Sequence, residues 1–346
     1  MGSQTLEDLA MQIARKGPQV MGKDTPIYQR AELTVADRRE IEGYRSIERL
    51  FKEYAVQKFV DGGRPLSIGV FGPPGSGKSF GIKQLAESAL KDVKALTFNL
   101  SQLSSPNDLR GAFHQIRDFS LRGKLPLVFW DEFDSTLNAE ALGWLRFFLA
   151  PMQDGVFQED QITHPIGHSI FLFAGGTTWS MDEFQRTHLG EEDKSERKRD
   201  SKPAPILKAS KARDFLSRLR GYLDVLGVDP TPNPNDDPLY IIRRAIILRS
   251  LLDKAPQSIA KIDGEVKEIK IDDGVLWAFL KIKEYRHGVR SMEAIISMSL
   301  LSGRPKFERS SLPPKAQLAL HVNADEFLTL LKPTGVLVAS PIPGSE

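Results

Sequence analysis

The chain has 346 residues, of which 40% are apolar and 27% charged, and its 47 basic and 45 acidic residues leave a formal net charge of +2. This length and composition fit a globular protein of roughly two domains with a sizeable core. The near balance of charge gives no support for binding of the whole chain to nucleic acid or to an anionic membrane, although a local basic patch is compatible with it. The chain has no cysteine, which excludes disulfides, thiolate metal sites and cysteine nucleophiles.

The sequence also bears on cellular location. A lack of cysteine fits a reducing cytoplasm. The N-terminus has no basic segment followed by an apolar run, as a signal peptide would. No apolar stretch approaches the roughly 18–20 residues that span a bilayer. We therefore expect a cytoplasmic protein without membrane contact.

Residues 1–62 read as a helical N-terminal segment. Thr34 is a candidate N-cap for a helix whose apolar positions, including Ile41, Tyr44 and Phe51, follow a spacing close to helical. The sequence Asp-Gly-Gly at 61–63 predicts the end of this helix and a turn.

From residue 63 to residue 228, short apolar runs alternate with longer helical patterns. The runs predict strands at 66–71, 95–100, 125–130 and 169–174, and the patterns predict helices at 80–90, 106–121 and 137–149. Between them, residues 151–168 could form a hairpin with Gly155 and residues 165–167 at its turns. Strands alternating with helices indicate an α/β domain built on a parallel sheet flanked by helices.

The remainder divides into a second domain and a tail. Residues 191–202 carry mixed charge and no apolar side chain, which predicts an exposed loop. Residues 229–238 hold four prolines and resemble a linker. Helical patterns at 239–254, 274–285 and 291–302 predict an all-helical lid domain over residues 229–310. The tail, residues 311–346, has no firm assignment, and 318–331 could be a last helix or a strand pair.

A phosphate-binding loop of the form G-x-x-x-x-G-K-[ST] follows the first strand. Its glycines let backbone N–H groups turn toward an anion, and the next helix offers its positive N-terminus. The lysine supplies charge for the β- and γ-phosphates, and the final hydroxyl can bind Mg²⁺. We expect ATP to contact this loop and the residue after it, namely Gly72, Pro73, Pro74, Gly75, Ser76, Gly77, Lys78, Ser79 and Phe80.

The strand at 125–130 runs directly into Asp131 and Glu132. A carboxylate at the carboxyl end of such a strand can hold Mg²⁺ beside Ser79. Glu132 is then placed to orient and deprotonate the attacking water. The loop and the acidic pair together predict a Mg²⁺-dependent ATPase.

This combination resembles the AAA+ ATPases, and over about residues 40–300 the chain is most similar to the Clp-type unfoldases (ClpX/HslU-like). Residues 171–178 look like the sensor-1 strand, residues 213–219 like the arginine-finger segment and residues 285–295 like the start of the sensor-2 helix. The resemblance assigns sensor 1 to Thr177, with Thr178 as the alternative. It assigns the finger to Arg218, with Arg220 in reserve, and sensor 2 to Arg290.

The resemblance also implies an assembly. In this family the arginine finger enters the active site of the neighbouring subunit, so we expect a homo-oligomeric ring, often of six subunits, acting on a protein partner or substrate. The region 99–108 departs from the unfoldases, which grip polypeptide there with an aromatic loop, because it holds no aromatic residue.

Three function hypotheses follow. The first is an oligomeric AAA+ ATPase that remodels a macromolecule. The second is a slow ATP-dependent switch or scaffold that controls a partner protein. The third is a nucleic-acid-stimulated ATPase, which the charge balance does not favour. His164 and His168 lie close to Glu159 and Asp160 in the sequence, which is compatible with a metal site, but loop histidines are usually solvated and the sequence favours that interpretation.

Overall fold

The computed structural model describes residues 5–22, 25–57, 63–189, 211–231, 237–263 and 266–331. The chain forms two compact units. One comprises Pro26–Gly227 and is called the sheet unit here, and the other comprises Met1–Thr25 with Val228–Glu346 and is called the helical unit. The predicted charged loop at 191–202 and the tail from 332 onward lie outside the described residues, as does part of the predicted linker.

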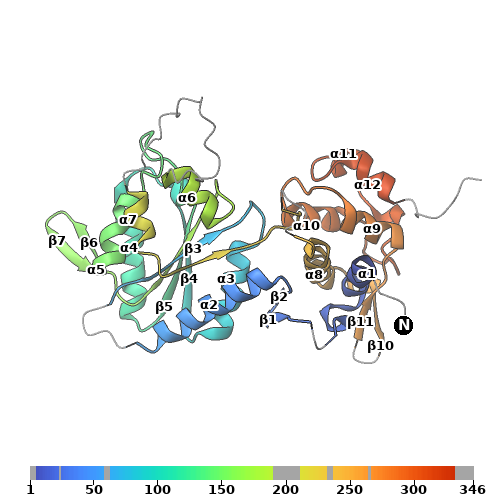
Figure 1. The fold of residues 1–346 in the computed structure, drawn as a ribbon, viewed down its shortest axis with the longest axis horizontal. Helices are drawn as coiled ribbons and strands as arrows, with labels where there is room; N and C mark the ends of the chain where they lie inside the picture. The colour runs from blue at the N-terminus through green and yellow to red at the C-terminus, as the bar shows by residue number, and fades with distance from the viewer. Residues whose placement is uncertain are drawn as a thin grey trace, which may run out of the picture. The chain divides into compact units, whose positions relative to one another are not determined.

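The sheet unit is built on a parallel five-stranded sheet, of which β3, β4 and β5 are labelled in Figure 1, and its strand order is β4-β5-β8-β3-β9. This confirms the predicted fold class. The strands are β3 (Leu66–Phe71), β4 (Val93–Asn99), β5 (Leu125–Asp131), β8 (Ile170–Ala174) and β9 (Gly221–Asp224), and the helices around them are α2 (Arg38–Ala55), α3 (Lys78–Ala89), α4 (Pro106–Leu121), α5 (Leu149–Asp154), α6 (Met181–Leu189) and α7 (Ala212–Leu216).

Both faces of the sheet are covered, which explains why its central strands read as continuous apolar runs. Along β5, Leu127 and Phe129 face one apolar core with side chains of α2 and α3. Val128 and Trp130 face the other core, which contains side chains of α4 and α6 and of the segment that follows β5. Alternate side chains of one strand therefore anchor two layers of helices.

A hairpin precedes β8, as the sequence predicted. Strands β6 (Val156–Glu159) and β7 (Ile162–Pro165) pair in antiparallel register. The turn lies at Asp160, whose φ is 52°. Gly155 and residues 165–167 flank the hairpin instead of turning it, because Gly155 ends α5 with a left-handed φ of 70°.

Two predicted local assignments are wrong. Thr34 is not a helix cap but lies in β2 (Leu33–Val35), which pairs with β1 (Tyr28–Arg30). The N-cap of α2 is Asp37, whose carboxylate accepts a hydrogen bond of 2.9 Å from the N–H of Arg39. A short hairpin thus occupies the stretch where the helix was expected to begin.

The predicted helix at 137–149 is also largely absent. Asn138, Ala139 and Leu142 have positive φ values of 51°, 63° and 56°, which an α-helix does not allow. Only a 3₁₀ turn (Leu145–Phe148) leads into α5. The apolar side chains that suggested a helix are buried, but the backbone that carries them is irregular; Trp144, for example, is 1% exposed.

The helical unit holds α1 (Leu6–Lys16), α8 (Tyr240–Asp253), α9 (Asp273–Lys281), α10 (Val289–Met298), α11 (Lys315–Leu318) and α12 (Ala324–Leu330). It is not all-helical as predicted, because β10 (Ala260–Asp263) and β11 (Val266–Ile269) form an antiparallel hairpin. The sequence left residues 318–331 as either a helix or a strand pair, and the structure has helices there, namely the end of α11 and α12. None of the helices in the described ranges is long and apolar enough to cross a membrane.

The N-terminal helix α1 belongs to this helical unit. Arg15 donates to the carbonyl of Ile271 at 3.1 Å, and Lys281 pairs with Glu7 at 2.7 Å. Inside the unit, the fully buried Arg244 donates to the carbonyls of Leu280 and Ile282 and pairs with a carboxylate. A buried guanidinium of this kind is tolerated because its donors are satisfied.

Candidate nucleotide site

The phosphate-binding loop follows β3, the strand that lies between β8 and β9. Gly72, Gly75 and Gly77 have φ values of 148°, 73° and 87°, which favour glycine. At Gly72 space is limiting as well, since a Cβ would lie 2.4 Å from the carbonyl oxygen of Val225. The strand and the loop glycines therefore have the positions and backbone conformations that the sequence predicted.

The helix after the loop begins at Lys78. The Lys78 ammonium donates to the carbonyl of Gly72 at 2.7 Å and to that of Pro73 at 3.3 Å, which holds it over the loop. Ser79 follows in the first turn and is partly exposed, and Phe80 is 39% exposed. The N–H groups at the start of α3 and the Lys78 charge together suit a polyphosphate anion.

The acidic pair lies at the end of β5. Asp131 is the last residue of the strand and is partly buried, while Glu132 is exposed. Glu132 has a φ of 54°, a left-handed conformation that is uncommon for a non-glycine residue. Such strain persists where the surroundings impose it and is frequent at functional sites.

The sensor-1 candidate lies beyond the end of β8, where the N–H of Gly175 donates to the carbonyl of Val70 at 3.2 Å. Thr177 is exposed, whereas Thr178 is 3% exposed and its hydroxyl has no partner among the described residues. Of the two alternatives, Thr177 is therefore the one that can reach a ligand.

Sequence reasoning missed Asp134. Its buried carboxylate accepts hydrogen bonds from the N–H groups of Gly176 (3.0 Å) and Thr177 (2.8 Å), and from the Thr177 hydroxyl at 2.5 Å. It thus ties the loop after β5 to the loop after β8. A signal was present in the sequence, since an acidic residue two positions after Glu132 had no other assigned role.

The order of strands brings these groups together. β5, β8 and β3 are neighbours and run parallel, so their carboxyl ends share one edge of the sheet. Lys78, Asp131, Glu132 and Thr177 all follow those ends. Ligands of open α/β sheets bind at this edge.

The two finger candidates lie elsewhere. The N–H of Arg220 donates to the carbonyl of Ser67 at 2.9 Å, at the amino end of β3. Ser67 and Gly72 are five residue steps apart along the chain, which is about 16 Å at ~3.3 Å per residue. Arg218 stands two residues earlier, is partly buried, and donates to the carbonyl of Asp214.

The sensor-2 candidate, Arg290, belongs to the helical unit. It is exposed and stands in the first turn of α10. A cation at a helix N-terminus is opposed by the helix dipole. This placement favours an anion as the partner of Arg290.

A partly buried carboxylate ends the neighbouring strand β9. Asp224 accepts a hydrogen bond of 2.9 Å from the N–H of Met181. Burial raises the pKa of Asp224, and the negative charge of Asp182 adds to this, against the effect of the Met181 hydrogen bond. Asp224 therefore positions the start of α6 beside the site.

The comparison with family models decides the class of this domain. Residues 68–187 match the family described as ATPase family associated with various cellular activities (AAA). The chain contains an AAA-family domain. The parallel sheet and its flanking helices are the fold of that family. The comparison with curated proteins gives no match.

Solved structures of nucleotide-bound proteins are similar to the chain at low identity. The ORC2 protein of Aeropyrum pernix in ADPNP–ADP complexes is 13% identical, with a TM-score of 0.45 over 91% of this chain and 70% of that one. Its ADP form is 11% identical, at 0.45 over 90% and 71%. NtrX from Brucella abortus in complex with ADP is 14% identical, at 0.45 over 83% and 58%.

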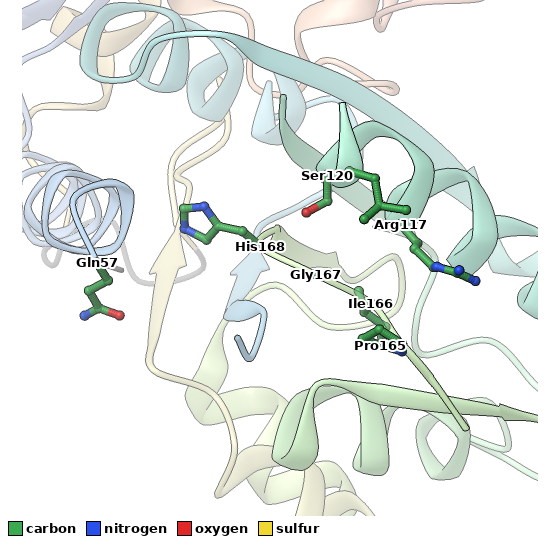
Figure 2. A pocket seen from close by; sticks show the side chains of 8 residues that line it. Gln57, Arg117, Ser120, Pro165, Ile166, Gly167 and His168 are labelled. Carbon is green, nitrogen blue, oxygen red and sulfur yellow. The ribbon is translucent and has the colours of Figure 1, made fainter. Parts of the chain in front are cut away.

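A separate hollow of about 270 Å³ lies elsewhere on the AAA domain (Figure 2). It is bordered by the end of α4, by the segment after β7 and by Gln57, with Arg117, Ser120, Leu121, Pro165, Ile166, Gly167 and His168 on its walls. None of these residues belongs to the phosphate-binding loop. This hollow is therefore distinct from the nucleotide site.

Proposed function

We propose that the chain is a Mg²⁺-ATP-dependent oligomeric AAA+ ATPase that couples hydrolysis to the remodelling of a macromolecule. One observation carries the proposal. The loop lysine, the acidic pair and Thr177 share one edge of the sheet, whereas Arg218 and Arg220 lie near its other end. An arginine that cannot serve its own site is suited to serve a neighbour's.

The residues fit Mg²⁺-ATP by their chemistry. The glycine cradle and the start of α3 would take the phosphates, with Lys78 on the β- and γ-phosphates. The Ser79 hydroxyl and the Asp131 carboxylate would hold Mg²⁺, which neutralises charge on the phosphates when it is bound.

Hydrolysis then needs a base and charge stabilisation. Glu132 orients a water and accepts its proton as the water oxygen bonds to the γ-phosphorus and the bond to the ADP oxygen breaks. Thr177 would turn its hydroxyl hydrogen from Asp134 to the γ-phosphate, while its N–H remains bonded to Asp134. Arg218 of a neighbouring subunit and Arg290 offset the charge that develops on the transferred group.

The remodelling role and the Clp-type assignment rest on the sequence resemblance. The β6–β7 hairpin before β8 supports them, because many members of the family insert such a hairpin there. The partner class is a protein or nucleoprotein complex. Stimulation of turnover by an added protein would favour this motor over a slow switch, and stimulation by DNA or RNA would favour the nucleic-acid alternative.

The decisive experiment mixes inactive variants. Glu132→Gln and Arg218→Ala should each abolish turnover alone. Mixed together, they should restore part of it, because an Arg218→Ala subunit keeps its own Glu132 and receives Arg218 from a Glu132→Gln neighbour. Mixing Glu132→Gln with Lys78→Ala is the matched control and should restore nothing, since both residues act within their own subunit.

A monomer with undiminished turnover on dilution would contradict the proposal, because it would remove the shared site. If Arg218→Ala alone retained turnover and Arg220→Ala behaved in its place as described, the finger would be Arg220.

A further inference from the structure

Three side chains that have no part in the nucleotide site converge between α4 and the β6–β7 hairpin. They are His114 of α4, Glu159 at the end of β6 and His164 of β7, and their ligand atoms all lie within 4.8 Å of one another. His114 Nε2 is 2.9 Å from Glu159 Oε2, and His164 Nε2 is 3.8 Å from the same oxygen.

The register of the β6–β7 hairpin brings two of these side chains to the same face. Phe157 pairs with His164 and Glu159 pairs with Ile162, so side chains at 157, 159 and 164 share one face. Phe157 is buried, and its ring contacts the His114 ring at 4.9 Å and the His164 ring at 5.3 Å between centroids. The apolar ring therefore supports both imidazoles from below.

We propose that His114, Glu159 and His164 form a binding site for a divalent transition-metal ion of the Zn²⁺ class. Two imidazoles and one carboxylate suit Zn²⁺, Co²⁺ and Ni²⁺ better than Mg²⁺ or Ca²⁺. Tetrahedral ligands about 2.0–2.1 Å from zinc lie roughly 3.4 Å apart, and the two distances to Glu159 bracket that value. The side chains are 33%, 43% and 19% exposed, so an ion can enter and a fourth position remains for water.

Arg117 lies where it disfavours metal binding, which gives the proposed site a distinctive test. Its Nη1 lies 3.2 Å from His164 Nδ1. A guanidinium only donates, so Nδ1 accepts and the hydrogen of a neutral His164 ring is on Nε2, facing Glu159. Metal binding through Nε2 moves that hydrogen to Nδ1, where Arg117 cannot accept it. Arg117 must therefore turn away when the metal binds.

The ion would join parts of the chain that are distant in sequence. It would fasten the hairpin to α4, which supplies a side wall of the same domain that holds the phosphate-binding loop. The site uses none of the residues assigned to ATP, so it stands independently of the proposed function.

The test measures Co²⁺ and Zn²⁺ binding to tag-free, nucleotide-free protein in excess Mg²⁺, by the visible absorption of bound Co²⁺ and by calorimetry. His114→Ala and His164→Ala should each weaken binding at least about tenfold. Glu159→Gln keeps the side-chain size and should do the same. Arg117→Gln should tighten binding, because its amide oxygen can accept the Nδ1 hydrogen. His168→Ala, outside the cluster, should bind as the wild type.

Thermal unfolding of each variant confirms that it is folded, and Glu159→Gln carries the test if a histidine variant is not. Lys78→Ala should retain the metal signal, which separates this site from the nucleotide site. Absence of Co²⁺ binding to the wild type, or wild-type affinity in Glu159→Gln, would overturn the proposal.

Discussion

Asp134 binds Thr177 through both the backbone N–H, at 2.8 Å, and the side-chain hydroxyl. Asp134 is 7% exposed, so little solvent competes for its carboxylate. Since Asp134 follows the acidic pair and Thr177 is the sensor-1 candidate, this contact joins two loops of one site. In the proposed mechanism, Asp134 is a positioning residue that acts on the nucleotide through Thr177.

We expect Asp134→Ala to lower the turnover of ATP at least about tenfold while nucleotide affinity changes little, because the lost contacts orient a group that acts in hydrolysis. Thr177→Val should have a similar effect. The double variant should lose less than the two single losses combined, because both single variants remove the hydrogen bond between the Thr177 hydroxyl and Asp134. Steady-state kinetics with separate nucleotide-binding measurements check this. Additive losses would show that the two residues act independently.

The sequence predicted the elements around the candidate site wherever their local pattern leaves few alternatives. The strand Leu66–Phe71 and the helix Pro106–Leu121 have the bounds that were expected, since an apolar run and a Pro-initiated amphipathic pattern leave few alternatives. The phosphate-binding loop motif likewise predicted a strand before it and a helix after it, and these are β3 and α3.

Features that depend on tertiary contacts were not predictable. Residues 137–149 carry a helix-like apolar pattern. Their apolar side chains are nevertheless buried in the core by an irregular backbone that includes residues of positive φ. Asp134 reads as a solvated acid until the loop after β8 is placed against it. Likewise His114 is 45 residues from Glu159 in the chain, and only packing of the hairpin on α4 brings them together.

The left-handed Glu132 supplies a second prediction. Replacing Glu132 by Gly should relieve backbone strain, and Glu132→Ala should not, so the glycine variant should be more stable than the alanine variant by about 0.5–1 kcal/mol. Both should lack ATPase activity. Denaturant unfolding at equilibrium measures the difference. Equal stabilities would mean that the surroundings do not impose this conformation once the side chain is lost.

The third prediction concerns the packing of α2 on α3, where Tyr44 lies against Gly81. A Cβ on Gly81 would lie 2.1 Å from the Tyr44 hydroxyl oxygen, and Tyr44 is 1% exposed. Gly81→Ala should therefore destabilise the sheet unit by about 1–3 kcal/mol. Tyr44→Phe removes the clashing oxygen, after which the nearest atom to that Cβ lies 3.0 Å away.

The double variant Gly81→Ala/Tyr44→Phe should recover part of the stability lost in Gly81→Ala, and Tyr44→Phe alone serves as its reference. Thermal or denaturant unfolding checks the set. A loss of stability in the double variant that equals or exceeds the sum of the two single losses would contradict the proposed clash.

The last prediction concerns Glu48, which joins α2 to β1. Its carboxylate accepts hydrogen bonds from the Tyr28 hydroxyl at 2.8 Å, from Lys52 at 2.7 Å and from Arg30 at 3.0 Å. Burial acts to raise the pKa of Glu48, but these hydrogen bonds and the Arg30 charge outweigh it and lower the pKa from 4.5 to about 2.

A carboxylate with a lowered pKa in the folded state stabilises the fold above its unfolded pKa, and that stability is lost as the pH falls through its folded pKa. For Glu48 the loss should extend from about pH 4.5 to about pH 2. Lys52 is 57% and Arg30 39% exposed. Solvent screening of these partners limits the contribution to about 1–2 kcal/mol.

Glu48→Gln should therefore be less stable than the wild type at pH 7 and should approach it as the pH falls toward 2. Glu42→Gln is the matched control on the same helix, since Glu42 is 62% exposed and pairs only with Arg38 among the described contacts. It should leave both the stability and its acid dependence nearly unchanged. Urea unfolding across this pH range measures the difference. A constant gap between Glu48→Gln and the wild type at every pH would show that Glu48 acts through shape and hydrogen bonding alone, because only an ionised carboxylate makes the gap depend on pH.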